Sequence, residues 1–259
     1  ESMTREAMGT DMGPLNPTLT SSYEIVWQGE SAERIAEKWD LTREELDRFS
    51  LESHRRAAAA QDACRFSPEI VPVEVGGKAV DADEGIRRDS TLEKLAGLKP
   101  SFRPDGRVTA GNASQISDGA AAALIASEAK ARALGLTPRA RIRSWAVAGV
   151  DPTLMLTGPI PSTKKALEKA GLTLADIDLV EINEAFASVV LAWGRASDPG
   201  WDKVNVNGGA IALGPPLGAT GGRLLATLLS EMERRDAELG LITICIGFGQ
   251  ALAAVVERA

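Results

Sequence analysis

The feature that most constrains this chain is a glycine-rich segment from Val204 to Gly222, VNVNGGAIALGPPLGATGG. Its first four residues alternate in polarity as a short strand does, and an apolar-periodic helix pattern follows its last glycines. A strand, a loop with little side chain and a helix N-terminus leave bare peptide N–H groups that a negatively charged or carbonyl oxygen can approach. A tight connection within an α/β unit is an equally good interpretation of the same pattern.

Composition limits the classes of protein to consider. Of the 259 residues, 44% are apolar and 25% are charged, the balance of a globular protein with a sizeable core. The net charge of −7 argues against nucleic-acid binding, because phosphate contacts need clustered Lys and Arg. No apolar run approaches a membrane span, and no signal-peptide pattern opens the chain. Two distant cysteines predict no disulfide and hence a reducing cytoplasm, and with one histidine they leave little material for a metal site.

The order of predicted elements indicates an α/β fold. Strands are predicted at residues 140–148, 177–182, 204–206, 239–246 and 252–257, and helices at 162–170, 184–193 and 218–235. This βαβαβαββ order predicts a mostly parallel sheet with helices on both faces and a hairpin at the end.

The first 116 residues predict a looser subdomain, with long polar loops between its helices and strands. Capping boxes at Thr42–Glu45 and Ser90–Glu93 mark two helix starts. A strand is expected at residues 69–75, and a short buried strand at Leu124–Ile125.

Two polar residues are expected where neighbouring strands end at one edge of the sheet. Cys245 comes directly before Gly247, where a thiol can transfer a proton or attack a substrate, although a lone cysteine is more often a small buried apolar residue. Asn183 follows the strand at 177–182, where its amide can hold a water or a carbonyl oxygen, or cap a helix. His54 is expected to be a solvated helix residue, and without a second histidine no Ser–His–Asp triad can form.

Several motifs in order resemble the thiolase family over essentially the whole chain. They are VTAGNAS at 108–114 with DGA at 118–120, VEINEAF at 180–186, NVNGGAIALG at 205–214 and CIG at 245–247. The resemblance implies two similar α/β halves with a loop domain inserted in the first. It also implies Claisen condensation of two acyl-CoA molecules, or thiolysis of a 3-ketoacyl-CoA by CoA. On that template the domains are a loop domain (1–116), the last elements of the N-terminal half (117–138) and the C-terminal thiolase domain (139–259).

The resemblance also implies roles for single residues. Cys245 matches the cysteine that moves the proton on the second substrate's α-carbon, and Gly247 matches a backbone donor to the oxyanion of the tetrahedral intermediate. Asn183 resembles the residue that holds a water in the other oxyanion hole. CoA, a substrate rather than a bound cofactor, is expected to contact Arg87 at its adenine end, Ser114 and Trp27 at its pantetheine, and apolar tunnel walls at Phe102, Met155 and Phe186.

Two departures from the family pattern affect the expected activity. The family's Gly-His-Pro is here Gly214-Pro215-Pro216, so Pro215 stands at the position of the family histidine and offers no hydrogen-bond donor. The family's nucleophilic cysteine belongs to the N-terminal half, which this template places before Glu1, and Cys64 is not its substitute.

We therefore expect an acyltransferase whose chain supplies the C-terminal half of the site. The alternative is a catalytically inactive CoA-binding or assembly subunit that pairs with a separate N-terminal half. A homodimer or homotetramer is the usual state of the family, and no nucleic-acid or membrane partner is expected.

Overall fold

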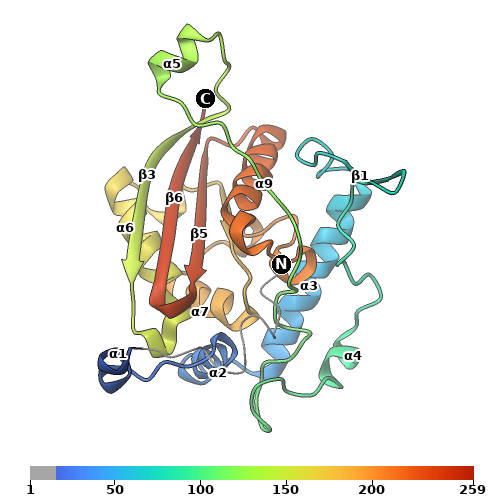
Figure 1. Cartoon of the computed structure of the whole chain (residues 1–259), viewed down its shortest axis with the longest axis vertical. Helices are drawn as coiled ribbons and strands as arrows, with labels where there is room; N and C mark the ends of the chain where they lie inside the picture. Colours follow the sequence, from blue (N-terminus) through green and yellow to red (C-terminus); the bar gives the residue numbers. More distant parts are fainter. Residues whose placement is uncertain (1–15) are drawn as a thin grey trace.

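The computed structural model describes residues 16–259 and arranges them around a four-stranded sheet (Figure 1). The strands lie in the spatial order β3 (Ala140–Gly149), β6 (Gln250–Arg258), β5 (Leu239–Ile246) and β4 (Leu179–Ile182). β6 pairs antiparallel with both β3 and β5, and β4 pairs parallel with β5. The α/β class is confirmed, but the sheet is mixed rather than mostly parallel. The segment expected as a further parallel strand, residues 204–206, contributes only isolated parallel bridges, Val180 with Val204 and Val206 with Gly208.

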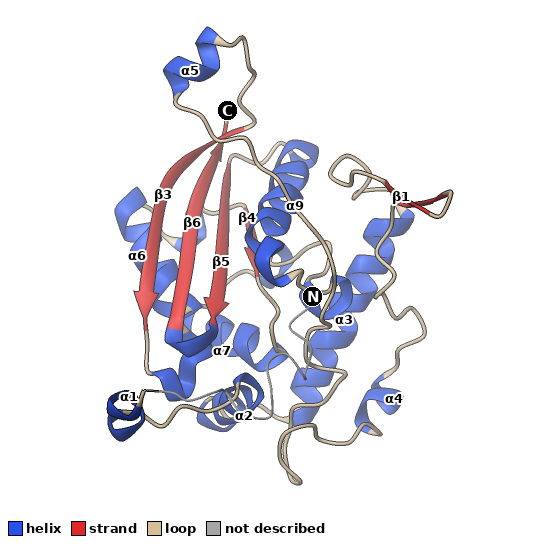
Figure 2. Ribbon diagram, in the orientation of Figure 1, coloured by secondary structure: helices blue, strands red, loops and turns tan. Residues whose placement is uncertain are grey.

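Helices pack on both faces of this sheet, as predicted, although the second face is covered only in part (Figure 2). α6 (Pro159–Ala170) and α7 (Ala187–Ser197) pack on one face, where Trp193 lies fully buried in the largest apolar cluster. α9 (Thr220–Arg235) packs on the other face through Leu224, Leu228 and Met232. These three residues recur at helical spacing, so a single stripe of α9 is buried.

The C-terminal hairpin closes at a tight turn next to the sheet edge that carries Cys245. The turn, η5 (Gly247–Gly249), has Phe248 at φ +62° and Gly249 at φ +86°. A Cβ on Gly249 would lie 2.5 Å from the carbonyl oxygen of Val150, so both the positive φ and the close approach require glycine.

The remaining elements lie around the four-stranded sheet and do not form a single layer (Figure 1). They are α1 (Pro17–Ser22), α2 (Gln28–Lys38), α3 (Arg43–Asp62), β1 (Val73–Val75), β2 (Lys78–Val80), α4 (Leu92–Ala96), α5 (Glu128–Ala133), η1 (Pro152–Thr157), η2 (Leu174–Asp176), η3 (Trp201–Lys203), α8 (Ala210–Leu213) and η4 (Leu217–Ala219). The capping box of Thr42 and Glu45 is confirmed at the start of α3. The second box is wrong by one residue, because Thr91 rather than Ser90 caps α4 and accepts from the amide of Lys94.

The strand predicted at Leu124–Ile125 does not form. Their side chains are 82% and 73% exposed, and the segment has no sheet partner among residues 16–259. An apolar run of this length fits a strand or a loop equally well, and only a neighbouring strand would have made it a sheet element.

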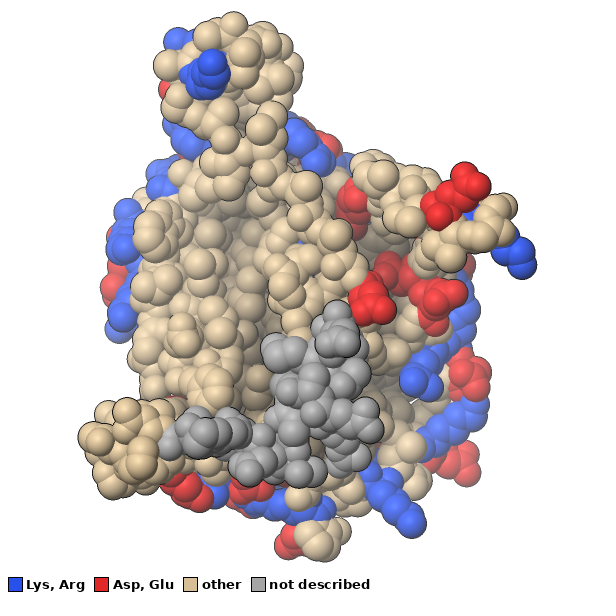
Figure 3. Space-filling model, in the orientation of Figure 1, with Lys and Arg blue, Asp and Glu red and all other residues tan. Residues whose placement is uncertain are grey.

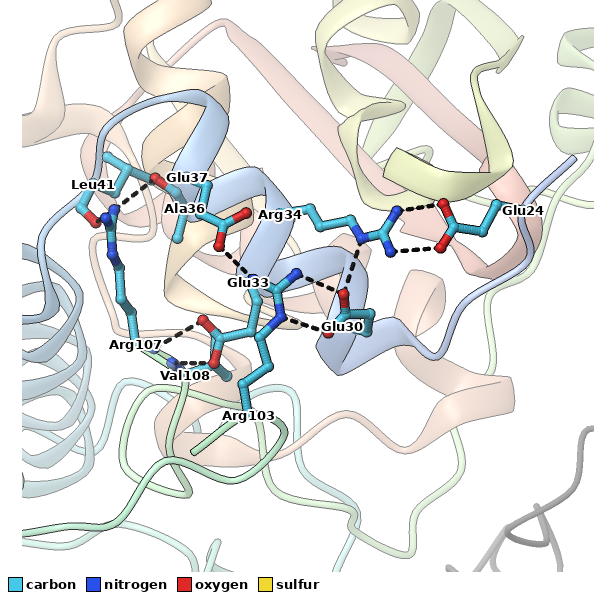
Figure 4. Close-up of polar contacts among 10 residues, drawn as sticks. All are labelled: Glu24, Glu30, Glu33, Arg34, Ala36, Glu37, Leu41, Arg103, Arg107 and Val108. Carbon is cyan, nitrogen blue, oxygen red and sulfur yellow. Dashed lines mark hydrogen bonds and ion pairs between the residues drawn. The ribbon is translucent and has the colours of Figure 1, made fainter. Parts of the chain in front are cut away.

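A polar network fastens residues 103–108 to α2 (Figure 4). The buried carboxylate of Glu33 accepts from the amides of Arg107 and Val108 at 2.8 and 2.9 Å. Arg103 pairs with Glu30, and the guanidinium of Arg107 donates to the Leu41 carbonyl oxygen at 2.7 Å. The network fixes the position of the residue just before it, Phe102, against the N-terminal turn of α2.

Within residues 16–259, no helix is both long enough and apolar enough to span a membrane.

Candidate active site

Asn183 and Cys245 lie at the same edge of the sheet, because β4 and β5 run parallel and β5 ends three residues beyond the last pair with β4. The register pairs Ile182 with Thr243, and the amide of Asn183 donates to the Thr243 carbonyl oxygen at 3.1 Å. Cys245 follows two residues later on β5. Both residues are 7% exposed. A buried thiol and a buried amide at the carboxyl edge of neighbouring parallel strands are well placed to act on one ligand.

Burial controls the chemistry of Cys245. Its side chain packs in an apolar cluster with Met155, Phe186 and Val189. This burial raises the pKa of the Cys245 thiol to about 12. The sulfur is therefore protonated at neutral pH, and its thiolate, once formed, is a strong base.

The side-chain oxygen of Asn183 is buried. Within the part of the chain that the structure describes, its Oδ1 atom has no hydrogen-bond partner. A buried amide oxygen without a partner costs free energy, and a bound water is the usual way to recover it. This observation fits an asparagine that holds a water molecule.

Apolar side chains gather beside Cys245. The rings of Phe102 and Phe186 meet edge to face, with centroids 6.1 Å apart. The Phe102 ring lies directly on the helix α2 backbone, because a Cβ on Gly29 would be 2.2 Å from it. Trp27 is the N-cap residue of the same helix. Met155 joins the hairpin turn to this group, since its sulfur accepts from the amide of Phe248 at 3.3 Å.

The segment around Ser114 also reaches this edge. Ala113 forms an isolated bridge with Phe186, and the amide of Ser114 donates to the Ala185 carbonyl oxygen at 3.0 Å. Gly247, at the start of the turn, lies next to α2, because a Cβ there would be 3.3 Å from Nε2 of Gln28.

Arg87 lies outside the cluster around Cys245. It is exposed, and its backbone amide donates to Nδ1 of His54 on α3 at 3.1 Å. The expectation of a solvated His54 is wrong: the residue is 4% exposed. Burial, with the nearby charge of Arg87, lowers the pKa of His54 to about 4, so its imidazole is neutral at pH 7.

Pro215 is buried in the glycine-rich loop directly after α8. The preceding residue, Gly214, has φ +77°, and a Cβ there would overlap the hydroxyl of Ser117 at 1.7 Å. The side chain of Gln115 donates to the carbonyl oxygens of Ile211 and Ala212 at 3.0 and 3.3 Å. Gln115 and Ser117 thus contact the loop from a neighbouring segment, and Pro215 itself offers no side-chain donor.

One buried residue next to Asn183 was not singled out from the sequence. Glu184 is 1% exposed, and its carboxylate accepts hydrogen bonds from Ser53, Asn205 and the amide of Ile211. The sequence pattern predicts Glu184 as the first residue of a helix at 184–193, whereas α7 begins only at Ala187. The available signal was its place in the INEAF motif, between a buried strand and a helix.

Two family models match almost the whole chain. The N-terminal domain of thiolase matches residues 3–129, and the C-terminal domain of thiolase matches residues 136–258. The chain belongs to the thiolase family. Among the residues described, no group of three or more His, Cys, Asp or Glu side chains could hold a metal ion.

Curated relatives carry the same family membership. The acetyl-CoA acetyltransferase of Rhizobium meliloti (strain 1021) is 55% identical over 246 residues, which are 93% of this chain and 62% of that protein. The acetyl-CoA acetyltransferase of Paracoccus denitrificans is 51% identical over 97% of this chain and 67% of that protein. The thiolase chain described here therefore spans about two thirds of the length of these relatives.

Solved thiolase structures superpose closely on this fold. A Bacillus anthracis acetyl-CoA acetyltransferase has a TM-score of 0.85 and 43% identity, covering 95% of this chain and 65% of that chain. Human mitochondrial 3-ketoacyl-CoA thiolase in complex with CoA has a TM-score of 0.86 and 40% identity, covering 97% of this chain and 65% of that chain.

These matches correct one expectation drawn from the sequence. Because the N-terminal thiolase domain matches residues 3–129, the chain is not a C-terminal part alone. The loop domain is inserted in the N-terminal half. Residues assigned to the loop domain are therefore already part of that half. The claim of a missing nucleophile half is therefore unsupported, and so is the inactive subunit that would pair with a separate N-terminal half. The boundaries at residues 116 and 138 stay a prediction.

Proposed function

We propose that this thiolase chain carries out acyl transfer between thioesters: Claisen condensation of two acetyl-CoA molecules, or thiolysis of acetoacetyl-CoA by CoA. The observation that carries the proposal is that Cys245 and Asn183 lie at the same edge of the paired strands β4 and β5, with Cys245 in an apolar cluster. The names of the bacterial relatives favour acetyl as the acyl group.

In the proposed chemistry Cys245 moves the proton of the α-carbon. For condensation, its thiolate takes a proton from the methyl group of one acetyl-CoA. The enolate carbon attacks the carbonyl carbon of a second acetyl thioester, a carbon–carbon bond forms, and the thiolate of that thioester leaves. In thiolysis a thiolate attacks the ketone carbonyl carbon, the carbon–carbon bond breaks, and the Cys245 thiol gives its proton to the enolate carbon that leaves. A thiol whose pKa burial raises to about 12 suits both steps, since it is a good acid toward a carbanion and a strong base once ionised.

Two groups would stabilise the charges that develop on oxygen. A water held by Asn183 would face the enolate oxygen, and the amide of Gly247 would face the tetrahedral oxyanion. Each well-placed donor of this kind is worth about 3–4 kcal/mol in the transition state. Pro215 adds no donor to the enolate site, so we expect a slow enzyme.

CoA would lie along the apolar cluster. Phe102, Met155 and Phe186 are its proposed tunnel walls, with Ser114 and Trp27 at the pantetheine. Arg87, exposed on its loop, would meet the adenine end. We also propose that the protein is a homodimer or homotetramer, which its mass in solution tests.

Thiolysis of acetoacetyl-CoA by CoA tests this function. The measurement is acetyl-CoA formed by the wild type, by Cys245→Ala and by Cys64→Ala. Cys64 is exposed and supplies the matched control for loss of a thiol. We expect turnover that survives in Cys64→Ala and falls at least about 1,000-fold in Cys245→Ala, the scale of an essential proton carrier. Equal rates in Cys245→Ala and the wild type would overturn the assignment.

A further inference from the structure

Glu184 is a buried acid for which the proposed chemistry has no use. Its Oε1 atom accepts from Nδ2 of Asn205 at 2.8 Å. Its Oε2 atom accepts from Oγ of Ser53 at 2.6 Å and from the amide of Ile211 at 3.1 Å. Both carboxylate oxygens thus accept from donors alone; burial raises the pKa of Glu184, and these three hydrogen bonds act against that rise by favouring the ionised form.

The three donors come from three separate segments of the chain. Ser53 belongs to α3, Asn205 to the turn after Val204, and Ile211 to α8. The hydroxyl of Ser53 also accepts from the amide of Gly209 at 3.1 Å. One carboxylate therefore joins the end of β4 to α3 and to the glycine-rich loop.

Asn205 is fixed from its other side as well. Its Oδ1 accepts from the amide of Ile182 at 2.8 Å, and its Nδ2 donates to the carbonyl oxygen of the same residue at 2.9 Å. The side-chain amide cannot rotate without losing both bonds. The donor that it presents to Glu184 is therefore fixed.

The glycines of the loop make room for this carboxylate. A Cβ on Gly209 would lie 2.3–2.7 Å from the carboxyl atoms of Glu184. Gly208 has φ +77°, and a Cβ there would lie 2.5 Å from the carbonyl oxygen of Ser53. The backbone of the glycine-rich segment thus packs against the carboxylate of Glu184, a negatively charged group of the same chain.

We infer that Glu184 is a positioning residue that locks the turn bearing Asn183 to the glycine-rich loop bearing Pro215. The catalytic part of this inference rests on the proposed function. Asn183 is the peptide neighbour of Glu184, and Ile211 lies in the short helix that ends just before Gly214 and Pro215. Through these links one carboxylate sets the distance between the two segments that surround the enolate oxygen.

Glu184→Gln tests the inference with little change in volume. The new amide can accept on one side only, so its NH₂ group faces either Asn205 or the pair of donors on the other side. Glu181→Gln is the matched control. Glu181 is a 2%-exposed carboxyl on β4, and its Oε2 has no hydrogen-bond partner among residues 16–259.

Two readouts separate positioning from folding. The first is hydrogen–deuterium exchange of residues 205–214, which needs no turnover; we expect exchange to rise at least about 10-fold in Glu184→Gln and not to rise in Glu181→Gln. The second is thiolysis, where we expect kcat to fall about 10- to 100-fold while KM for acetoacetyl-CoA changes less than about 3-fold.

Each outcome decides the inference. Unchanged exchange in Glu184→Gln overturns the lock, whatever the activity. Raised exchange with an unchanged kcat overturns its role in catalysis. If the wild type itself shows no thiolysis, the proposed function fails, while the exchange experiment still decides the lock. Should Glu184→Gln fail to fold, Ser53→Ala removes one donor and should raise exchange at Gly209, whereas Ser53→Thr should restore protection; equal exchange in both contradicts the lock.

Discussion

At the scale of single residues, burial sets the behaviour of the titratable groups around the site. His54 shows this most simply, because burial is the main cause of its low pKa of about 4 and the charge of Arg87 adds to it. The unfolded chain, with a histidine pKa near 6.5, binds more protons than the folded chain between about pH 4 and 6.5.

We predict that the stability contributed by neutral His54 is fully present above about pH 6.5 and is lost as the pH falls toward about 4. The difference corresponds to about 3 kcal/mol. Urea unfolding of the wild type and of His54→Gln at about pH 7, 5 and 4 measures it. The wild type should lose more stability than the variant over this range, and parallel losses would contradict the buried neutral imidazole.

The pKa of Glu181 is shifted in the opposite direction. Burial raises its pKa to about 8, against the lowering effect of Arg223, whose nearest nitrogen is 3.7 Å away. A group whose pKa rises on folding stabilises the protein below its unfolded pKa, near 4.5, and loses that contribution as the pH rises to about 8.

We therefore predict that Glu181→Gln is more stable than the wild type at about pH 8, by up to about 4 kcal/mol, and gains little at about pH 5. Thermal unfolding at the two pH values measures the change. A variant that is less stable at about pH 8 would show instead that Glu181 is ionised and paired with Arg223.

Pro215→His tests the missing donor of the glycine-rich loop. One oxyanion donor is worth roughly 100-fold or more in rate, so we expect thiolysis to increase by about that factor. Pro216→His, one residue further along, is the control for the loss of a loop proline. Equal rates in Pro215→His and the wild type would rule out position 215 as a donor site.

Motifs predicted part of the candidate site, and the structure brings Phe102, Met155, Phe186, Ser114 and Cys245 close together. The lock at Glu184 could not be predicted. Its hydroxyl donor, Ser53, lies 131 residues away in the chain, and no local pattern connects the two. A charged residue that follows a strand ordinarily lies exposed in the first turn of a helix, where water hydrogen-bonds to it. At Glu184, donors from distant segments of the chain take the place of that water.

At the scale of elements, predictions succeeded where local signals were strong. β5 occupies the predicted residues, Leu239–Ile246, and α6 ends at the predicted Gly171 cap, at φ +68°. The predictions failed where a neighbouring strand determines whether a segment joins the sheet. Residues 204–206, predicted as a strand, form only isolated bridges. Strand formation depends on a neighbour that the sequence does not reveal.

The capping box of α3 gives a test at this scale. The hydroxyl of Thr42 accepts from the amide of Glu45 at 3.2 Å, and Oε2 of Glu45 accepts from the amide of Thr42 at 2.7 Å. Thr42→Ala should destabilise the protein by about 1 kcal/mol, whereas Thr42→Ser should cost much less. Urea unfolding compares them, and equal stabilities would show that the cap contributes little.

At the scale of the whole molecule, the sheet has two unlike faces. One is buried under α6 and α7. α9 covers part of the other face, beside β4 and β5. The rest of that face carries the exposed side chains of Trp145 and Val147 on β3, 57% and 59% exposed, and Ile246 on β5. Figure 3 shows this side of the molecule, where charged side chains lie mainly at the edges. The mixed sheet brings Cys245 and Asn183 to one edge because β4 and β5, its single parallel pair of strands, end there.

Exchange of the methyl protons of acetyl-CoA in D₂O tests the central claim most directly, because it isolates the proton transfer assigned to Cys245. Deuterium in the acetyl group is measured by mass spectrometry for the wild type, Cys245→Ala and Cys64→Ala. We predict exchange in the wild type and in Cys64→Ala, and none above the uncatalysed rate in Cys245→Ala. Exchange by Cys245→Ala at the wild-type rate would contradict the account.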